Sequence, residues 1–293
     1  MRRNSLPPRF KSPVDLEQPG ALLTAYRRDG FAIIEDFFKE RACRDLIERA
    51  DHLVSNADLS ALATVFSTTS LRHATDEYFA TSGDKIRFFL EEGAFDAGGQ
   101  LIYPRQRAIN KIGHALHDLD ETFDRFSRDS HVAKLVGALG LRQPLLLQSM
   151  YIFKQANIGG EVVCHTDATY LFTEPLSVVG LWIALEDATI DNGCLWALPG
   201  CHTGPLKSRF RRGPAGLSTE VYDATPWPMS RRTPLEVARG TLILLNGLCP
   251  HMSDINRSPR SRQAYTLHVI DGACDYPADN WLQRGPEMPL RGF

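Results

Sequence analysis

The chain has 293 residues, 43% hydrophobic and 23% charged, values close to the averages for soluble globular proteins that exclude global disorder. Its 33 Lys and Arg nearly balance its 35 Asp and Glu, and a formal charge of -2 gives no general attraction for nucleic acid. Its longest apolar runs are shorter than the roughly 20 residues of a membrane-spanning helix. We therefore expect a small-molecule partner, with neither nucleic acid nor membrane involved.

The six cysteines are widely scattered, contain no Cys-x-x-Cys pair and follow no apolar secretory signal. Reduced thiols and a cytoplasmic location are the simplest expectation. The chain shows no internal repeat, so we predict a single domain over residues 15–293, as a monomer or weak homodimer. Residues 1–14 are predicted to be a flexible arm, because their prolines prevent an amphipathic helix.

The first half of the chain is predicted to be mainly helical. Apolar residues at helical spacing predict helices over residues 15–29 and 41–54, with the short strand FAIIEDFF, residues 31–38, between them. We also predict a helix over residues 110–119 and one or two more over residues 121–139.

Strand-like runs replace helices from Pro144 onward. The runs are PLLLQSMYIFKQ, GGEVVCHTDATYLF, SVVGLWIALEDAT, GCLWALPGCH, GTLILLNG and AYTLHVID. Short strands in succession, without helices between them, predict an antiparallel sandwich or barrel of the jelly-roll or cupin type, with the helical half packed outside. Residues 204–234, rich in Arg, Pro and Gly, are predicted to be a long loop that serves as a lid or a mobile insertion.

The first candidate for chemistry is the motif His165-Thr166-Asp167. Residues two apart in an extended chain share a face, so this imidazole and carboxylate can bind one metal ion together. Taken alone, the motif favours a surface aspartate hydrogen-bonded to a neighbouring histidine over a metal site. His251 follows a strand and a Leu-Cys-Pro turn and can add a second imidazole, although a lone loop histidine more often caps a backbone carbonyl. Two histidines and one carboxylate form the facial triad of non-haem Fe(II) oxygenases, so we predict these three residues as catalytic metal ligands.

A basic segment beyond His251 offers groups for an acidic cosubstrate. Arg262 opens a strand, where its guanidinium can hold a carboxylate through two charge-assisted hydrogen bonds, and Ser253 can add a hydroxyl. This equipment suits the distal carboxylate of 2-oxoglutarate. On chemistry alone, Arg257 and Arg260 compete with Arg262, and all three can equally belong to a solvated basic turn.

Several longer motifs extend this pattern along the chain. They are INKIGHALHDLD, LLLQSMYIFKQANIGGEV, HTDATYLFTEP, LWIALEDATIDNGCLWALPGCH, HMSDINRSPRSRQAYTLH and NWLQ. In this order they resemble the phytanoyl-CoA dioxygenase family of Fe(II)- and 2-oxoglutarate-dependent oxygenases, over about residues 20–285. The resemblance implies a mainly β fold with flanking helices, a double-stranded β-helix barrel with an N-terminal helical layer.

The resemblance also implies roles for single residues. The family's metal motif falls on His165, Asp167 and His251, and its carboxylate-binding arginine, eleven residues past the distal histidine, falls on Arg262. The other residues matched to the cosubstrate pocket are Lys111, Met150, Trp182 and Ser253. Each of these has a structural alternative, as a solvated lysine, ordinary core side chains or a turn hydroxyl.

The implied activity is hydroxylation of a small-molecule or acyl substrate, with Fe(II), dioxygen and 2-oxoglutarate, and with release of succinate and CO2. Related halogenases replace the carboxylate ligand with a small residue, so Asp167 favours hydroxylation or another oxidation such as desaturation. Two alternatives from other classes are a non-catalytic metal-binding cupin-like barrel and an interaction scaffold in which the triad positions are structural.

The sequence also offers candidate residues for the surroundings of the site. Candidate lid residues are Phe88, Phe89, Tyr103, Arg209, Arg211 and Arg212. The arginines can meet a carboxylate or a CoA phosphate, but such a charge run is more often a solvated face. We place His202 in a Pro-Gly-x-His turn outside the metal shell. His268 is predicted to be a barrel histidine, with proximity to the cosubstrate left open.

Overall fold

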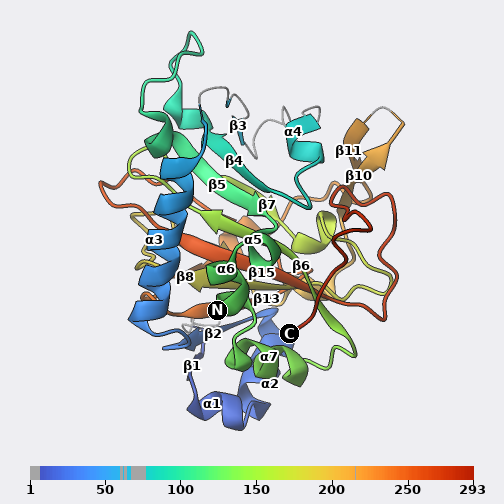
Figure 1. The fold of residues 1–293 in the computed structure, drawn as a ribbon. Coiled ribbons are helices and arrows are strands. Elements are labelled where there is room, and N and C mark those ends of the chain that lie inside the picture. Colours follow the sequence, from blue (N-terminus) through green and yellow to red (C-terminus); the bar gives the residue numbers. More distant parts are fainter. Residues whose placement is uncertain (1–6, 60–61, 63–64, 67–76, 215) are drawn as a thin grey trace.

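The computed structural model describes residues 7–59, 62, 65–66, 77–214 and 216–293, and two sheets dominate it (Figure 1). The larger sheet has nine strands in the order β1 (Arg9–Lys11), β2 (Phe31–Glu35), β13 (Leu242–Asn246), β8 (Val179–Ala184), β15 (Ala264–Asp271), β6 (Pro144–Ile152), β5 (Ile109–His114), β4 (Ile86–Glu91) and β3 (Val65–Phe66). The smaller sheet has four strands in the order β12 (Thr233–Leu235), β9 (Leu195–Ala197), β14 (His251–Ser253) and β7 (Val162–His165). Two sheets in this arrangement enclose an interior that can hold a site.

The order of the strands identifies the barrel. β8 pairs with β13 on one side and β15 on the other, and β14 pairs with β9 and β7, all antiparallel. These paired strands are far apart in sequence, as in a double-stranded β-helix, and the predicted fold class is confirmed. All eight residues of β15 are buried, because helices cover one face of this central strand and the barrel interior lies at the other.

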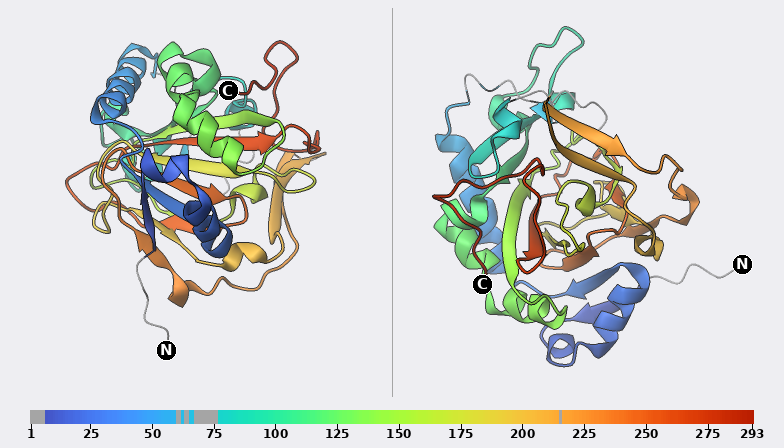
Figure 2. Two further views of the ribbon diagram at one scale, coloured as in Figure 1. Left: turned by 90° about the horizontal axis from the view of Figure 1, so that it is seen from below. Right: turned by 90° about the vertical axis from the view of Figure 1, so that its right-hand side faces the viewer.

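A helical layer covers the outer face of the larger sheet (Figures 1 and 2). Its members are α3 (Glu40–Asn56), α5 (Leu116–Leu119), α6 (Glu121–Ser127) and α7 (Ser130–Ala138). Leu46 of α3 and Phe123 of α6 share one hydrophobic core with outward-facing Tyr265 and Leu267 of β15. The side chain of Asp120 accepts hydrogen bonds from the first backbone N–H groups of α6 and so fixes where this helix begins.

Two predicted helices take a different form near the amino terminus. The predicted helix over residues 15–29 is two helices, α1 (Val14–Glu17) and α2 (Gly20–Asp29), because Pro19 interrupts the backbone hydrogen bonds between them. Part of the predicted arm is also ordered. β1 pairs in parallel with β2, and Phe10 within it is buried, so an apolar side chain ties this segment to the sheet edge.

The predicted helix over residues 110–119 is wrong. Residues 109–114 form β5, which pairs with both β4 and β6, and only residues 116–119 are helical. Gly113 is a poor helix former, and pairing on two sides with segments far away in sequence decides the conformation. The correction matters because it moves Lys111 from a helix into a central strand.

The predicted loop over residues 204–234 contains a hairpin instead, formed by β10 (Ser208–Gly213) and β11 (Gly216–Val221). Arginines of β10 bind the segment before the carboxyl terminus, which runs beside the hairpin in Figure 1. Arg209 pairs with Asp279, and Arg212 Nε donates to the carbonyl oxygen of Trp281 at 3.0 Å. The basic cluster therefore joins the hairpin to the end of the chain rather than forming a solvated face.

Among the described residues, no helix combines the length and apolar character needed to cross a bilayer. All six cysteines are free thiols, and three of them are buried.

Candidate metal centre

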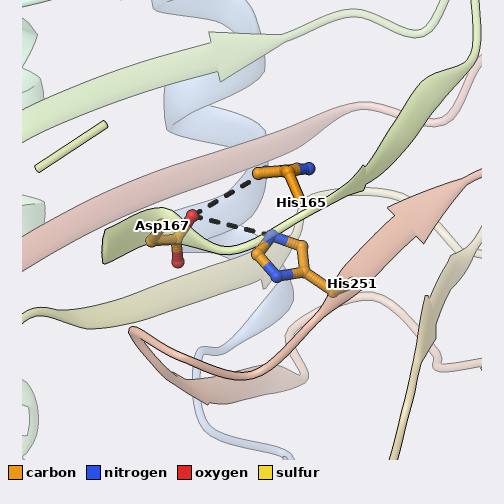
Figure 3. Close-up of side chains that lie close together, drawn as sticks. All are labelled: His165, Asp167 and His251. Atoms are coloured by element: carbon orange, nitrogen blue, oxygen red, sulfur yellow. Dashed lines mark ion pairs between the residues drawn. The ribbon is translucent and has the colours of Figure 1, made fainter. Parts of the chain in front are cut away.

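The three predicted ligands come together in the smaller sheet. His165 ends β7 and lies opposite His251, the first residue of β14, while Asp167 opens the short 3-10 turn that follows β7. Asp167 Oδ1 lies 3.9 Å from His165 Nε2 and 3.6 Å from His251 Nε2, and all three ligand atoms lie within 4.8 Å of one another. Figure 3 shows the side chains pointing toward one common position. One ion can therefore contact all three.

Hydrogen bonds prepare both imidazoles to act as ligands. His165 Nδ1 lies 2.9 Å from the carbonyl oxygen of Val163, and His251 Nδ1 lies 3.0 Å from that of Cys249. A carbonyl oxygen only accepts, so each Nδ1 carries the proton and each Nε2 keeps its lone pair. Both lone pairs face the position shared with Asp167, as metal-binding histidines require.

The surroundings of Asp167 fit the role of a metal ligand. The residue is 6% exposed, and among the described residues no hydrogen-bond donor reaches its buried Oδ2. A buried carboxylate oxygen without a partner costs about 1–3 kcal/mol or more. Gly180 of β8 leaves the space for this oxygen, since a Cβ there would lie 2.7 Å from Oδ2. The donor set, two imidazole nitrogens and one carboxylate, suits Fe(II).

The charge states also suit a metal site. Burial lowers the pKa of His165 to about 4, and the nearby His251 acts in the same direction, so His165 is neutral near pH 7. Burial alone would raise the pKa of Asp167, but His268 and His251 outweigh burial and hold it below its usual range. A neutral imidazole beside an ionised carboxylate is the state in which both bind metal.

His268 belongs to this group more closely than the sequence indicated. Its Nε2 lies 3.4 Å from Asp167 Oδ1, and its buried Nδ1 has no hydrogen-bond partner among the described residues. Alternation along β15 offered a signal, because Thr266 and His268 are two residues apart and so share a face. His268 is buried in the barrel, as predicted. Its contact with Asp167 was not predicted.

The side chains predicted around the cosubstrate lie on the same inner face. Thr266 pairs with Met150 on one side and with Trp182 on the other, and residues opposite each other across a sheet share a face. Lys111 Nζ lies 3.7 Å from Met150 Sδ, and Lys111 is 4% exposed, so it is not a solvated lysine. Burial lowers the pKa of Lys111 well below its usual value.

Arg262 is the buried member of the three competing arginines. It is 2% exposed, whereas Arg257 and Arg260 lie at the surface. Its Nε donates to the carbonyl oxygen of Gly193 at 3.0 Å, and its guanidinium lies 5.2 Å from the ring centre of Trp182. Its buried Nη1 finds no hydrogen-bond acceptor in the described part of the chain. An unpartnered buried guanidinium nitrogen fits an anion.

Other predicted residues lie apart from the three ligands. His202 Nε2 lies 3.1 Å from the carbonyl oxygen of Arg27, beside Gly30, in the turn where we expected it. Phe89 is fully buried against Phe79 in a core cluster, so its predicted lid role is wrong. Phe88 and Tyr103 are partly buried and pack against the largest core cluster.

A double-stranded β-helix with a buried His-Asp-His group defines the class of mononuclear non-haem metal proteins of cupin-like fold. The family model described as "Phytanoyl-CoA dioxygenase (PhyH)" matches residues 26–264, and the chain belongs to this family. It is thus a non-haem iron dioxygenase that depends on 2-oxoglutarate, as the sequence motifs implied.

Curated relatives agree with the family assignment, and a solved structure agrees with the fold. The chain is 46% identical over 278 residues to "Phytanoyl-CoA dioxygenase domain-containing protein 1" of Bos taurus, covering 92% of this chain and 96% of that protein. It is 44% identical over 268 residues to "Phytanoyl-CoA dioxygenase" of Arabidopsis thaliana, covering 91% and 94%. The epimerase SnoN, solved "in complex with Fe3+, alpha ketoglutarate and nogalamycin RO", has a similar fold, with a TM-score of 0.65, 16% identity and coverage of 96% and 94%.

Proposed function

We propose that the protein hydroxylates a small-molecule or acyl substrate and converts 2-oxoglutarate to succinate and CO2, with iron held by His165, Asp167 and His251. The observation that carries the proposal is the convergence of three ligand atoms within 4.8 Å, one of them from a buried carboxylate whose other oxygen, Oδ2, has no donor among the described residues. When bound, Fe(II) supplies the activation of dioxygen that protein side chains cannot supply. A small-molecule substrate is consistent with the family.

The protein's own task is to bind and orient the cosubstrate. Arg262 offers its free Nη1 to the distal carboxylate, and Ser253, on the same strand as His251, offers a hydroxyl. Both side chains are 2% exposed, so bulk water does not compete for the carboxylate, and charge-assisted hydrogen bonds are stronger there than at the surface. The hydrogen bonds from Arg262 and Ser253 to the distal carboxylate determine which end of the oxo acid faces the metal ligands.

Apolar and basic side chains complete the proposed cosubstrate pocket. Trp182 and Met150 form walls on either side of Thr266, and the buried Lys111 adds a positive charge above the rings of Phe79 and Phe89. Because burial disfavours the charged form of Lys111, a nearby carboxylate would recover the lost charge stabilisation. We therefore propose Lys111, Met150 and Trp182 as cosubstrate contacts.

Asp167 bears on the type of reaction. A carboxylate at this position takes up the coordination site that halide needs in related halogenases. Asp167 is ionised and lies near both imidazoles, so the space that a small residue would leave for a halide is filled by its carboxylate. Hydroxylation, or a desaturation that begins in the same way, is therefore the proposed outcome.

The test combines Fe(II), 2-oxoglutarate and a set of candidate acids and acyl-CoAs, scored by succinate formed above the uncoupled background. One candidate should raise succinate, and His165→Ala should abolish both the uncoupled and the coupled reactions. His131→Ala is the matched control, because His131 lies on the exposed side of α7 with its side chain 53% exposed. Metal binding without consumption of 2-oxoglutarate would indicate the non-catalytic barrel, and absence of coupled metal and oxo-acid binding would indicate the scaffold.

A further inference from the structure

Lys154, just beyond β6, is a buried lysine that the proposed chemistry does not yet use. It is 2% exposed. Its backbone carbonyl oxygen accepts hydrogen bonds from the backbone N–H of Arg262 at 3.2 Å and from Asn256 Nδ2 at 3.0 Å. The backbone of Lys154 is therefore fixed against the segment that presents Arg262.

The ammonium group of Lys154 holds Ser253. Its Nζ lies 2.9 Å from Ser253 Oγ and 2.5 Å from the carbonyl oxygen of Gly160. A lysine ammonium has donors and no acceptor, so Ser253 Oγ must accept in this pair. The proton of the Ser253 hydroxyl is thereby left to donate to another group, such as a carboxylate oxygen.

Gly193 allows the side chains of Lys154 and Arg262 to lie next to the same backbone segment. A Cβ at Gly193 would lie 2.8 Å from Lys154 Cε, so only glycine lets the lysine side chain pass. The carbonyl oxygen of the same residue accepts the hydrogen bond from Arg262 Nε at 3.0 Å. Lys154 and Arg262 thus approach Gly193 together, and Ser253 lies at the tip of the lysine.

The charges around Lys154 do not balance. The buried charged side chains that meet there are Lys154, Arg262 and Glu91, whose Oε2 accepts from the backbone N–H of Gly160 at 3.0 Å. Among these buried side chains, two cations face one carboxylate, and an excess positive charge is costly in a buried site. The less buried carboxylates of Asp254 and Glu161 offset this excess only in part. Burial lowers the pKa of Lys154 to about 7, and the charge of Arg262 acts in the same direction. A single bound carboxylate would restore the balance.

We propose that Lys154 is a positioning residue for a dicarboxylic oxo acid: it orients the Ser253 hydroxyl and adds a second positive charge beside Arg262. The inference rests on the proposed function. It means that Lys154, together with Arg262, makes the protein prefer an oxo acid with a distal carboxylate to one without it.

The experiment compares two cosubstrates that differ only at the distal end. 2-Oxoglutarate and 2-oxopentanoate are titrated calorimetrically into the full chain loaded with Mn(II), so that binding is read without turnover. Lys154→Met should weaken binding of 2-oxoglutarate about tenfold or more, and change binding of 2-oxopentanoate less than about twofold. Lys154→Gln keeps a donor for Ser253 without the charge and should lose less. Lys134→Met, at an exposed position of α7, is the matched control and should bind both acids normally.

The outcomes separate this inference from the proposed function. If the unsubstituted protein with Mn(II) binds no 2-oxoglutarate, the proposed function itself fails. If the unsubstituted protein binds it, but Lys154→Met binds both acids normally or loses both equally, the role of Lys154 is refuted. Should neither variant fold, a crystal structure of the unsubstituted protein with Mn(II) and 2-oxoglutarate decides. Ser253 Oγ should then contact the distal carboxylate while Lys154 Nζ contacts Ser253, and a lysine turned away overturns the proposal.

Discussion

Replacing Gly180 by alanine should disable the metal centre without unfolding the barrel. The added Cβ would lie 2.7 Å from Asp167 Oδ2, roughly 0.7 Å short of ordinary van der Waals separation. The same Cβ would also lie 3.4 Å from Leu245 Cβ and 3.7 Å from His268 Cδ2, so these side chains limit how far it can shift away from Asp167. The carboxylate must therefore move by several tenths of an ångström. Displacing a group that orients metal binding typically costs about 10- to 100-fold in affinity, and we expect a loss of this size.

The assay is titration of Gly180→Ala with Mn(II) or Fe(II), together with thermal unfolding of the metal-free protein. Gly137→Ala is the matched control, because nothing lies within 4 Å of a Cβ at this position of α7. Alanine is favoured over glycine in a helix by about 1 kcal/mol, so this control should be slightly more stable and should bind metal normally. If Gly180→Ala folds and binds metal as tightly as the unsubstituted protein, the steric reasoning about Asp167 is refuted.

Three further predictions concern the surroundings of the site and the fold. His268→Leu removes a contact 3.4 Å from Asp167 Oδ1 and should weaken Mn(II) binding about tenfold, measured by titration. Asp118→Asn should destabilise the protein by about 3 kcal/mol in urea unfolding, because the buried carboxylate lies 2.8 Å from both Arg128 and Arg291. Although burial raises it, hydrogen bonds from His117, Arg128 and Arg291 hold the pKa of Asp118 below its usual range, so its contribution should be present at neutral pH and lost as pH falls below about 4. Chelation should lower the unfolding temperature of the metal-loaded protein reversibly, since metal at 100 times its dissociation constant adds about 2.7 kcal/mol to stability.

Local sequence pattern was sufficient where strands or helices are strongly patterned. The run AYTLHVID predicted β15, and apolar residues at helical spacing predicted the helix that the structure shows as α3. The prediction for residues 109–114 was wrong because their alternation of apolar and polar residues is weak and their conformation depends on pairing with β4 and β6. Such pairing joins residues far apart in sequence and leaves little trace in the segment itself.

The candidate site divides in the same way. The His-x-Asp spacing and the order of the motifs predicted the three ligands, whose candidate ligand atoms lie within 4.8 Å of one another in the structure. Lys154 was missed because its contact with Ser253 spans 99 residues and its burial follows from the packing of separate segments. A lysine after a strand ordinarily indicates a surface position, and only the fold shows that its ammonium points inward.

The site contains one buried anionic group and one buried cationic group with an atom that lacks a hydrogen-bond partner among the described residues. This difference in charge explains why a metal ion and an oxo acid should bind together. In the described part of the chain, Asp167 Oδ2 lacks a donor and Arg262 Nη1 lacks an acceptor, although both are buried. A cation alone would satisfy the first atom and an anion alone the second. A dicarboxylate that bridges them brings its negative charge to the bound cation as well as to the arginine. We therefore expect each ligand to stabilise the other, and a pocket open to water would reduce that coupling through the higher dielectric constant.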